Sequence, residues 1–165
     1  MITASSLETR AVGESLASLL RAGDVLLLQG DLGAGKSELT RGLARGLGVD
    51  GPVPSPSFTI LNVYEEGRAP LYHFDWYRLR GADELFEMGM EEYLGGDGIA
   101  VVEWPERCPE AVPEDCLVLH MDWLGPDRRR IAFEARGRMA ERAEALSRLL
   151  PETDGETDKD EASAD

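Results

Sequence analysis

Residues 30–37 restrict the possible folds of this chain more than any other segment, because Gly-Asp-Leu-Gly-Ala-Gly-Lys-Ser matches the pattern G-x-x-x-x-G-K-[ST]. An apolar run of strand length, residues 25–29, precedes the match. After it, Leu39, Leu43 and Leu47 recur every four residues, as on one face of a helix. A strand, a glycine-rich turn and a helix form the context in which this pattern makes a phosphate-binding loop, the P-loop. The sequence therefore predicts an α/β core that binds phosphate.

The residue types of this loop suit phosphate chemistry. Its glycines allow the backbone to curl so that several N–H groups point at phosphate oxygens, and the start of the next helix adds a partial positive charge. We expect Lys36 to reach the β- and γ-phosphates and Ser37 to hold Mg²⁺. The chain has 17 Lys and Arg residues, of which only Lys36 and Lys159 are lysines. A lysine here, in a chain that otherwise uses arginine, indicates a chemical requirement for a compact ammonium group.

Length and charge limit the class of protein. With 165 residues the chain is expected to form one domain, which we place at residues 1–150. Residues 151–165 hold seven acidic residues and one lysine, so they contribute −6 to the net charge of −15 and predict a disordered acidic tail. Phosphate contacts dominate the affinity of proteins for nucleic acid. A chain this acidic is therefore expected to meet RNA only through a partner.

The sequence predicts a cytoplasmic protein. Its first 20 residues have no long apolar run, and no apolar stretch approaches the roughly 20 residues that a membrane span requires. Cys108 and Cys116 are the only cysteines, and we interpret them as reduced thiols, with a disulfide as the alternative. Their spacing from His73 and His120 does not match a zinc site.

Periodicity along the rest of the chain predicts an α/β class, P-loop NTPase-like three-layer fold. Its central sheet is expected to mix parallel and antiparallel strands, flanked by helices, because two pairs of strands are close enough to form hairpins. Ser5 and Glu8 fit a capping box for the first helix, and Asp83 is expected to cap the third. The expected helices lie at about residues 5–22, 37–47, 83–90 and 139–150, and the expected strands at 25–29, 58–64, 71–74, 99–102, 116–121 and 129–134.

Two acidic residues compete for the role of second magnesium ligand. Glu103 ends the apolar run 99–102, and Asp75 ends the run 71–74. A buried parallel strand beside the P-loop strand should be apolar on both faces, which favours Glu103 as the metal ligand. Asp75 is then free to orient the attacking water or to act as a base, and its alternative role is to cap the following turn. The alternative for Glu103 is an ion pair with a nearby arginine.

Two further segments could serve the site. Residues 51–57 contain three prolines and must form an extended loop. Ser55, Ser57 and Thr59 lie where a switch segment would sense a γ-phosphate, although a simple capped loop is equally compatible. We interpret the three arginines at residues 128–130 as a solvated face rather than as a phosphate clamp.

Several segments together resemble one known family, the bacterial TsaE (YjeE) family of P-loop ATPases in tRNA threonylcarbamoyladenosine biosynthesis. The resemblance covers roughly residues 5–137, and the ordered set of segments makes it specific. The segments are Gly-Asp-Leu-Gly-Ala-Gly-Lys-Ser at 30–37, Ser-Pro-Ser-Phe-Thr at 55–59, His-Phe-Asp-Trp-Tyr-Arg at 73–78, Glu84-Leu85 with Gly89 and Glu92-Tyr93, and Val-Glu-Trp-Pro-Glu at 102–106.

This resemblance implies a Mg²⁺-dependent ATPase that is required for threonylcarbamoyladenosine at position 37 of tRNAs reading codons that start with A. It implies weak hydrolysis that partner proteins stimulate, and binding to the TsaD–TsaB pair, which carries the transfer chemistry. Contact with tRNA would run through these partners, and no membrane is involved. The alternative, from a different class, is a small-molecule P-loop kinase. Such kinases usually bring an arginine-bearing lid, and no such segment lies between the central strands.

The resemblance also assigns residues. It implies that Lys36 and Asp75 are catalytic and that Ser37 and Glu103 serve Mg²⁺. Ser37 and Ser57 stand where the family more often has threonine, and the hydroxyl is kept at both positions. The acidic tail is not part of the family pattern. The implied ATP-binding residues are Thr9, Asp31, Leu32, Gly33, Ala34, Gly35, Lys36, Ser37, Glu38 and Arg130.

Overall fold

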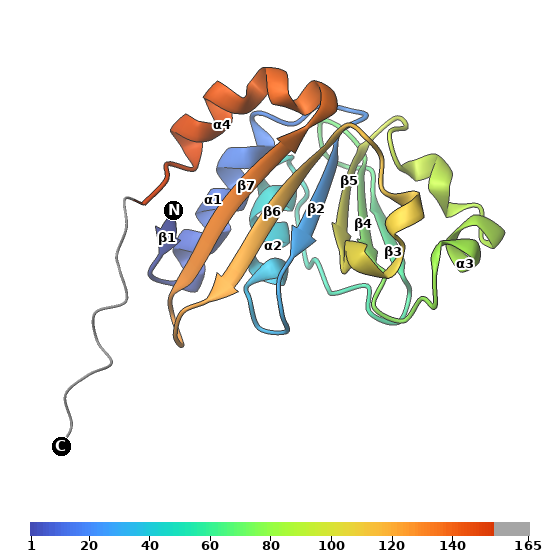
Figure 1. Ribbon diagram of the computed structural model, residues 1–165, viewed down its shortest axis with the longest axis horizontal. Helices are drawn as coiled ribbons and strands as arrows, with labels where there is room; N and C mark the ends of the chain where they lie inside the picture. The colour runs from blue at the N-terminus through green and yellow to red at the C-terminus, as the bar shows by residue number, and fades with distance from the viewer. Residues whose placement is uncertain (154–165) are drawn as a thin grey trace.

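The computed structural model describes residues 1–153, so the predicted tail lies, from residue 154 onward, outside the described residues. Within this range the chain forms one mixed sheet in the order β1-β7-β6-β2-β5-β4-β3 (Figure 1). The strands are β1 (Ile2–Thr3), β2 (Val25–Gln29), β3 (Leu61–Tyr64), β4 (Leu71–Asp75), β5 (Ile99–Glu103), β6 (Cys116–Trp123) and β7 (Arg129–Arg136). The α-helices are α1 (Ser6–Ala17), α2 (Lys36–Gly46), α3 (Ala82–Glu87) and α4 (Ala143–Leu149), and the 3-10 turns are Met90–Tyr93, Pro105–Arg107, Pro109–Ala111 and Gly137–Arg142.

The centre of the sheet is parallel and its margins are antiparallel. Strand β2 pairs in parallel with both β5 and β6, and β5 pairs in parallel with β4. The hairpins β3–β4 and β6–β7 are antiparallel, as is the pair β1–β7. Every residue of β4 and β5 is buried, as expected for parallel strands covered on both faces. The predicted mixed sheet is therefore confirmed, with β5 beside the strand that leads into the P-loop.

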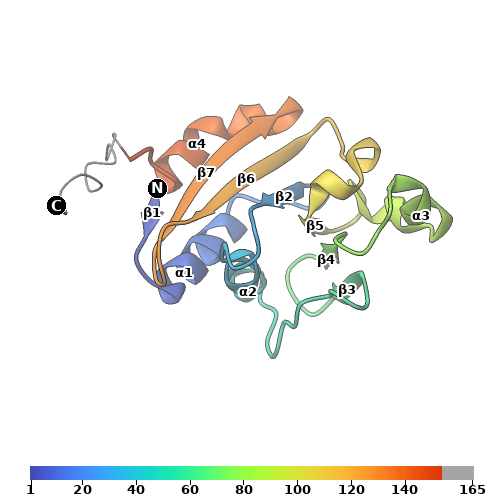
Figure 2. The same ribbon diagram turned by 60° about the horizontal axis from the view of Figure 1, so that its bottom comes forward.

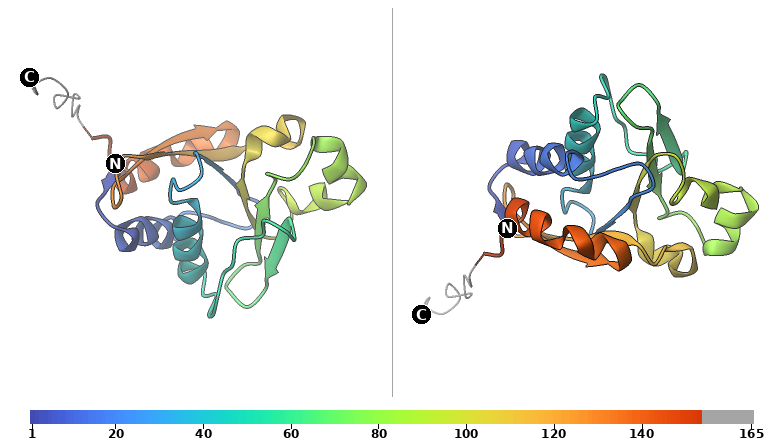
Figure 3. Two further views of the ribbon diagram at one scale, coloured as in Figure 1. Left: turned by 90° about the horizontal axis from the view of Figure 1, so that it is seen from below. Right: turned by 90° about the horizontal axis from the view of Figure 1, so that it is seen from above.

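Two apolar clusters cover the two faces of the sheet. Because side chains alternate along a strand, Leu26 and Leu28 of β2 join a cluster with α1 and α2, whereas Val25 and Leu27 join one with α3. Figure 2 shows α1 and α2 side by side beneath β2, β6 and β7. Figure 3 shows α3 at the opposite end of the molecule from the N-terminus. Helices thus flank the sheet as predicted.

Local signals explain the start of α1 and the two ends of α2. Glu8 N donates to Ser5 Oγ (3.1 Å), which confirms Ser5 as the cap of α1, while Glu8 Oε2 accepts from Ala4 N (2.6 Å) rather than from Ser5 N as in a regular capping box. Helix α2 opens at Gly35 and ends beside Gly48, whose φ of 90° is the left-handed value favoured after a helix end. Its predicted leucine face is buried.

Two glycines allow α1 and α2 to pack with their backbones in close approach. A Cβ added to Gly42 of α2 would lie 1.8 Å from the carbonyl oxygen of Arg10 in α1. A Cβ added to Gly13 of α1 would lie 2.0 Å from the carbonyl oxygen of Leu39 in α2. Only the absence of a side chain permits these approaches. They fix α1 against the helix that carries the P-loop.

We expect Gly42→Ala to destabilise the protein by about 2 kcal/mol or more, because the new methyl group meets backbone that cannot move aside. This overpacking exceeds the gain of about 1 kcal/mol in helix propensity. Urea unfolding, followed by circular dichroism, measures the change in midpoint. The control is Gly81→Ala, because no atom lies within 4 Å of the added Cβ. Equal midpoints for both variants would contradict the proposed close packing.

The structure corrects several local expectations. Residues 58–60 are not part of the strand, because Ile60 has φ 69° and β3 begins only at Leu61. Asp83 does not cap α3, whose N-cap is Gly81 without a side-chain hydrogen bond. The two-residue β1 is too short to have a sequence pattern and was missed. The first residues of the helix expected at 139–150 belong instead to a 3-10 segment, Gly137–Arg142.

Both cysteines lie in the interior of the protein. Cys108 and Cys116 are free and buried, and burial raises the pKa of Cys108 to about 11 and raises that of Cys116 as well. Neither thiol is therefore poised to react as a thiolate.

In the described part of the chain, no helix is both long enough and apolar enough to cross a membrane.

Candidate functional site

A cavity of about 580 Å³ lies where the parallel strands end. The P-loop joins the carboxyl end of β2 to the start of α2, and Asp75 and Glu103 close β4 and β5 at the same edge. This edge of a parallel sheet is the usual place for a ligand in an open α/β fold. Parallel pairing thus gathers residues from distant parts of the sequence. The lining residues are Leu32, Gly33, Gly35, Lys36, Ser37, Glu38, Ser55, Ser57, Asp75, Tyr77, Glu103, Trp104 and Arg129.

The P-loop has the backbone geometry that its glycines predict. Gly33 and Gly35 adopt φ 84° and 97°, values that residues with side chains rarely adopt. A Cβ added to Gly30 would lie 2.5 Å from the carbonyl oxygen of Met121, so the loop lies directly against β6. The turn therefore leaves backbone N–H groups at the start of α2, where the helix end favours negative charge.

Lys36 is held inside its own loop. Its Nζ donates to the carbonyl oxygen of Gly30 (2.6 Å) and lies 3.8 Å from the centre of the Trp104 ring. Burial lowers the pKa of Lys36, and the carboxylates of Glu103 and Asp75 oppose that shift. Among residues 1–153 the close partners of the ammonium group are thus a neutral carbonyl and a ring, which a phosphate oxygen can replace as a stronger, charged acceptor.

The two competing acids lie side by side. Asp75 and Glu103 are register partners on β4 and β5, and only 7% and 4% of their surfaces are exposed. Tyr77 N donates to Asp75 Oδ1 (2.9 Å), so Asp75 caps the following turn and also lines the cavity. Burial raises the pKa of Asp75, against the effect of the Tyr77 hydrogen bond. Both roles considered for Asp75 are therefore compatible with its position.

Glu103 has a buried partner that the sequence did not indicate. Its Oε2 is 2.8 Å from Nε2 of His73, in a pair that is almost completely buried. The partner is a histidine rather than the arginine considered from sequence. This hydrogen bond fixes one carboxylate oxygen of Glu103.

The remaining predicted residues divide between the site and its margins. Thr9 is buried, shares a 2.7 Å hydrogen bond with Thr3, and lines a smaller adjoining cavity with Glu38 and Arg129. Arg130 lines neither cavity and is exposed, on the opposite face of β7 from Arg129. In the P-loop, Asp31 and Leu32 are exposed and Ala34 is buried.

Sequence reasoning missed Arg129, Trp104 and Tyr77, which all line the large cavity. Arg129 Nη1 donates to the carbonyl oxygen of Gly125 (2.7 Å), while its buried Nε has no partner among the described residues. The available signal was strand alternation, because Arg129 shares a face of β7 with the fully buried Ile131. The structure therefore adds a second cation to the site, besides Lys36.

The proline-rich loop reaches the site with two of its three hydroxyl residues. Ser55 and Ser57 line the cavity, whereas the Thr59 hydroxyl donates to Asn62 Oδ1 (2.8 Å) instead. Just beyond, Ile60 accepts a hydrogen bond from Asp75 N (2.9 Å) while its own backbone is left-handed. Trp104, directly after Glu103, is left-handed too, with φ 59°. Each site acid is thus next to a strained non-glycine residue.

The donor set at the cavity suits magnesium bound together with phosphate. Ser37 supplies a hydroxyl, and Asp75 and Glu103 supply carboxylates, all hard oxygen donors. Over residues 1–153, no group of three or more His, Cys, Asp or Glu residues could hold a metal. Magnesium usually takes one or two protein carboxylates plus substrate phosphates, rather than a complete protein cage. Lys36 and Arg129 complement a polyanion in the same cavity.

A parallel β core with a glycine loop between β2 and α2, and acids at the ends of neighbouring strands, defines this chain as a P-loop α/β protein. Residues 3–131 match the family described as "Threonylcarbamoyl adenosine biosynthesis protein TsaE", and the chain belongs to this family. The family resemblance found in the sequence is therefore confirmed.

Individual relatives agree with this assignment. The chain is 44% identical over 142 residues to the tRNA threonylcarbamoyladenosine biosynthesis protein TsaE of Bacillus subtilis, covering 86% of this chain and 89% of that protein. It is 52% identical over 102 residues to the Synechocystis protein of the same name, covering 59% and 64% of the two chains. The crystal structure of Bacillus subtilis YdiB superposes with a TM-score of 0.76 at 40% identity, covering 90% of this chain and 93% of that one.

Proposed function

We propose that this protein binds and hydrolyses ATP with Mg²⁺ to support formation of threonylcarbamoyladenosine at position 37 of tRNAs that read codons starting with A. It acts in the cytoplasm, together with TsaD and TsaB, and meets tRNA through these partners. One observation carries the proposal: Lys36, Ser37, Asp75 and Glu103 line a single cavity at the carboxyl edge of the sheet. The names of its relatives supply the pathway.

Each residue has a chemical role in this proposal. The N–H groups of the P-loop and the Lys36 ammonium bind the phosphates, and Thr9 and Arg129 border the nucleotide beside the loop. Ser37 and Glu103 would hold Mg²⁺, which neutralises charge on the phosphate oxygens when bound. The remaining carboxylate, Asp75, orients the attacking water and accepts its proton.

The proline-rich loop acts as a switch that responds to the γ-phosphate of the bound nucleotide. Ser55 and Ser57 line the cavity from the segment that follows α2. Their hydroxyl groups can bind a γ-phosphate oxygen, and hydrolysis removes that contact. The loop is therefore ordered in the ATP-bound form and released in the ADP-bound form. Equal affinity of both forms for the partner pair would contradict this role.

ATP hydrolysis with Mg²⁺, measured alone and with the TsaD–TsaB pair added, tests the proposal. We expect slow release of phosphate by the protein alone and a severalfold or greater increase with the pair. ATP labelled at the γ-phosphate identifies the acceptor. Transfer of the label to a metabolite instead of to water would indicate a small-molecule kinase. Hydrolysis that stays flat when the pair is added would contradict partner stimulation.

A further inference from the structure

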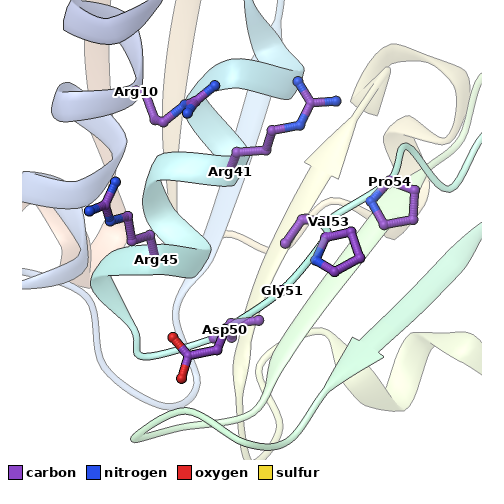
Figure 4. A pocket seen from close by; sticks show the side chains of 9 residues that line it. Arg10, Arg41, Arg45, Asp50, Gly51, Val53 and Pro54 are labelled. Atoms are coloured by element: carbon purple, nitrogen blue, oxygen red, sulfur yellow. The ribbon is translucent and has the colours of Figure 1, made fainter.

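A second cavity of about 440 Å³ lies between α1, α2 and the segment that leaves α2. Arg10 of α1 and Arg41 and Arg45 of α2 form one side, and residues 49–54 form the other (Figure 4). We call this cavity the arginine pocket. It shares no lining residue with the large cavity at the P-loop. Three arginine residues lining one pocket are unexpected on a chain with a net charge of −15.

The arginine pocket has more positive than negative charge. Glu38 pairs with Arg10 (2.8 Å) and with Arg41 (2.6 Å), and both arginines stay partly exposed. Arg45 is exposed, and no acidic side chain of residues 1–153 pairs with it. Asp50 lies on the opposite segment, at one end of the pocket (Figure 4). The pocket therefore has cationic groups available for an incoming anion.

The shape and lining of the pocket suit an acidic peptide. Planar guanidinium groups bind carboxylates through paired hydrogen bonds. The wall facing them is apolar, with Val49, Pro52, Val53 and Pro54. A segment with a carboxylate beside an apolar side chain can satisfy both walls at once. The volume is also within the usual range of small-ligand sites, roughly 300–1,000 Å³.

Nucleic acid fits the same features less well. Its binding depends on several phosphate contacts spread along an extended basic surface. Here the three arginines line one pocket instead of a stripe. The carboxylate of Asp50 can accept a backbone N–H or a basic side chain of a bound peptide.

We propose that the arginine pocket binds an acidic segment of a partner protein, and that this segment belongs to the TsaD–TsaB pair. The inference rests on the proposed function, which names that pair. It adds the face of the chain that meets the partner and the kind of group that the face accepts.

Two connections link the arginine pocket to the nucleotide site. Glu38 lines the large cavity and also holds Arg10 and Arg41. The segment 49–54 continues directly into Ser55 and Ser57, which line the large cavity. A carboxylate that engages Arg10 and Arg41 competes with Glu38 and brings residues 49–54 against the new ligand. Binding at one cavity is therefore coupled to the other, in both directions.

The test is the affinity of the TsaD–TsaB pair for full-length Arg45→Glu. We expect a loss of roughly tenfold or more, because the new carboxylate repels the acidic segment. Arg148→Glu is the control, because both residues are basic residues in the last turn of a helix and Arg148 lies outside the pocket. The control is expected to stay within about twofold of the wild type. Unchanged affinity in Arg45→Glu would overturn the inference.

Two further measurements separate this inference from its alternatives. Arg45 lies outside the P-loop cavity, so the Arg45→Glu variant should bind ATP and hydrolyse it without partners as the wild type does. If the wild type itself fails to bind or hydrolyse ATP, the proposed function is rejected instead. A peptide of alternating glutamate and leucine residues should displace the pair from the wild type, and failure to do so overturns the inference. If Arg45→Glu weakens binding only when tRNA is present, the occupant is nucleic acid and the peptide is rejected.

Discussion

Lys36→Ala is expected to lower the affinity for ATP roughly 100-fold, because hydrogen bonds to charged groups contribute about 1.5–3 kcal/mol and every 1.4 kcal/mol changes affinity tenfold. In the free protein the ammonium group bonds the carbonyl oxygen of Gly30 and lies over the Trp104 ring. The favourable partner, phosphate, arrives with the nucleotide. Isothermal titration with ATP measures the loss.

The melting temperature of the Lys36→Ala variant distinguishes a loss of ATP binding from a loss of the folded structure. Burial lowers the pKa of Lys36, which indicates that its charge is not at a favourable position in the free protein. The free Lys36→Ala protein should therefore melt at the same temperature as the wild type or higher. Lys36→Arg should also bind ATP weakly, because a planar guanidinium does not replace a compact ammonium group at this position. Wild-type affinity in Lys36→Ala would remove Lys36 from the phosphate site.

Glu103→Gln is expected to reduce Mg²⁺-dependent ATP hydrolysis by roughly 100-fold or more, since metal-assisted charge stabilisation supplies several kcal/mol. The amide keeps the size of the side chain and an oxygen for the hydrogen bond to His73, so the fold should be retained. It loses the negative charge that binds the metal. Titration of hydrolysis rate against Mg²⁺ concentration is the measurement. ATP binding without Mg²⁺ should change little.

Asp75→Asn is the matched control for the metal assignment. The two acids are register partners in the same cavity, and the substitutions are chemically equivalent. Asp75→Asn should slow hydrolysis while leaving the Mg²⁺ concentration for half-maximal rate close to that of the wild type. The opposite pattern, a normal Glu103→Gln enzyme with altered metal dependence in Asp75→Asn, would transfer the metal role to Asp75.

Much of the fold follows from local sequence signals. The apolar run of β5 and the leucine spacing of α2 are patterns of adjacent residues, and both elements are where the sequence predicts them. The contact between α1 and α2 could not be predicted in this way. It depends on Gly13 and Gly42, which lie in separate helices and leave no periodic pattern. Residues 58–60 have strand-like composition, but the left-handed Ile60 turns the chain before β3.

The residues of the site also differ in whether local sequence alone could place them. The P-loop is contiguous in sequence, so its residues and their positions could be predicted together. Asp75 and Glu103 could be placed at strand ends, but their contact depends on β4 pairing with β5. Arg129 required the register of β7 to distinguish it from its neighbours in the basic cluster. The arginine pocket draws on two helices and a loop, so no sequence pattern indicated it.

The left-handed backbones of Ile60 and Trp104 have a consequence for the evolution and engineering of this protein. Such conformations cost about 1–3 kcal/mol each in residues other than glycine, and these two adjoin the site acids. Selection for heat resistance alone would tend to remove them, since glycine or asparagine relieves the backbone strain, although replacing Trp104 also removes the ring beside Lys36. The acid-bearing edge of the sheet is therefore where thermal stability and turnover are in direct opposition, and stabilising substitutions are better placed in the helices and the remote loops.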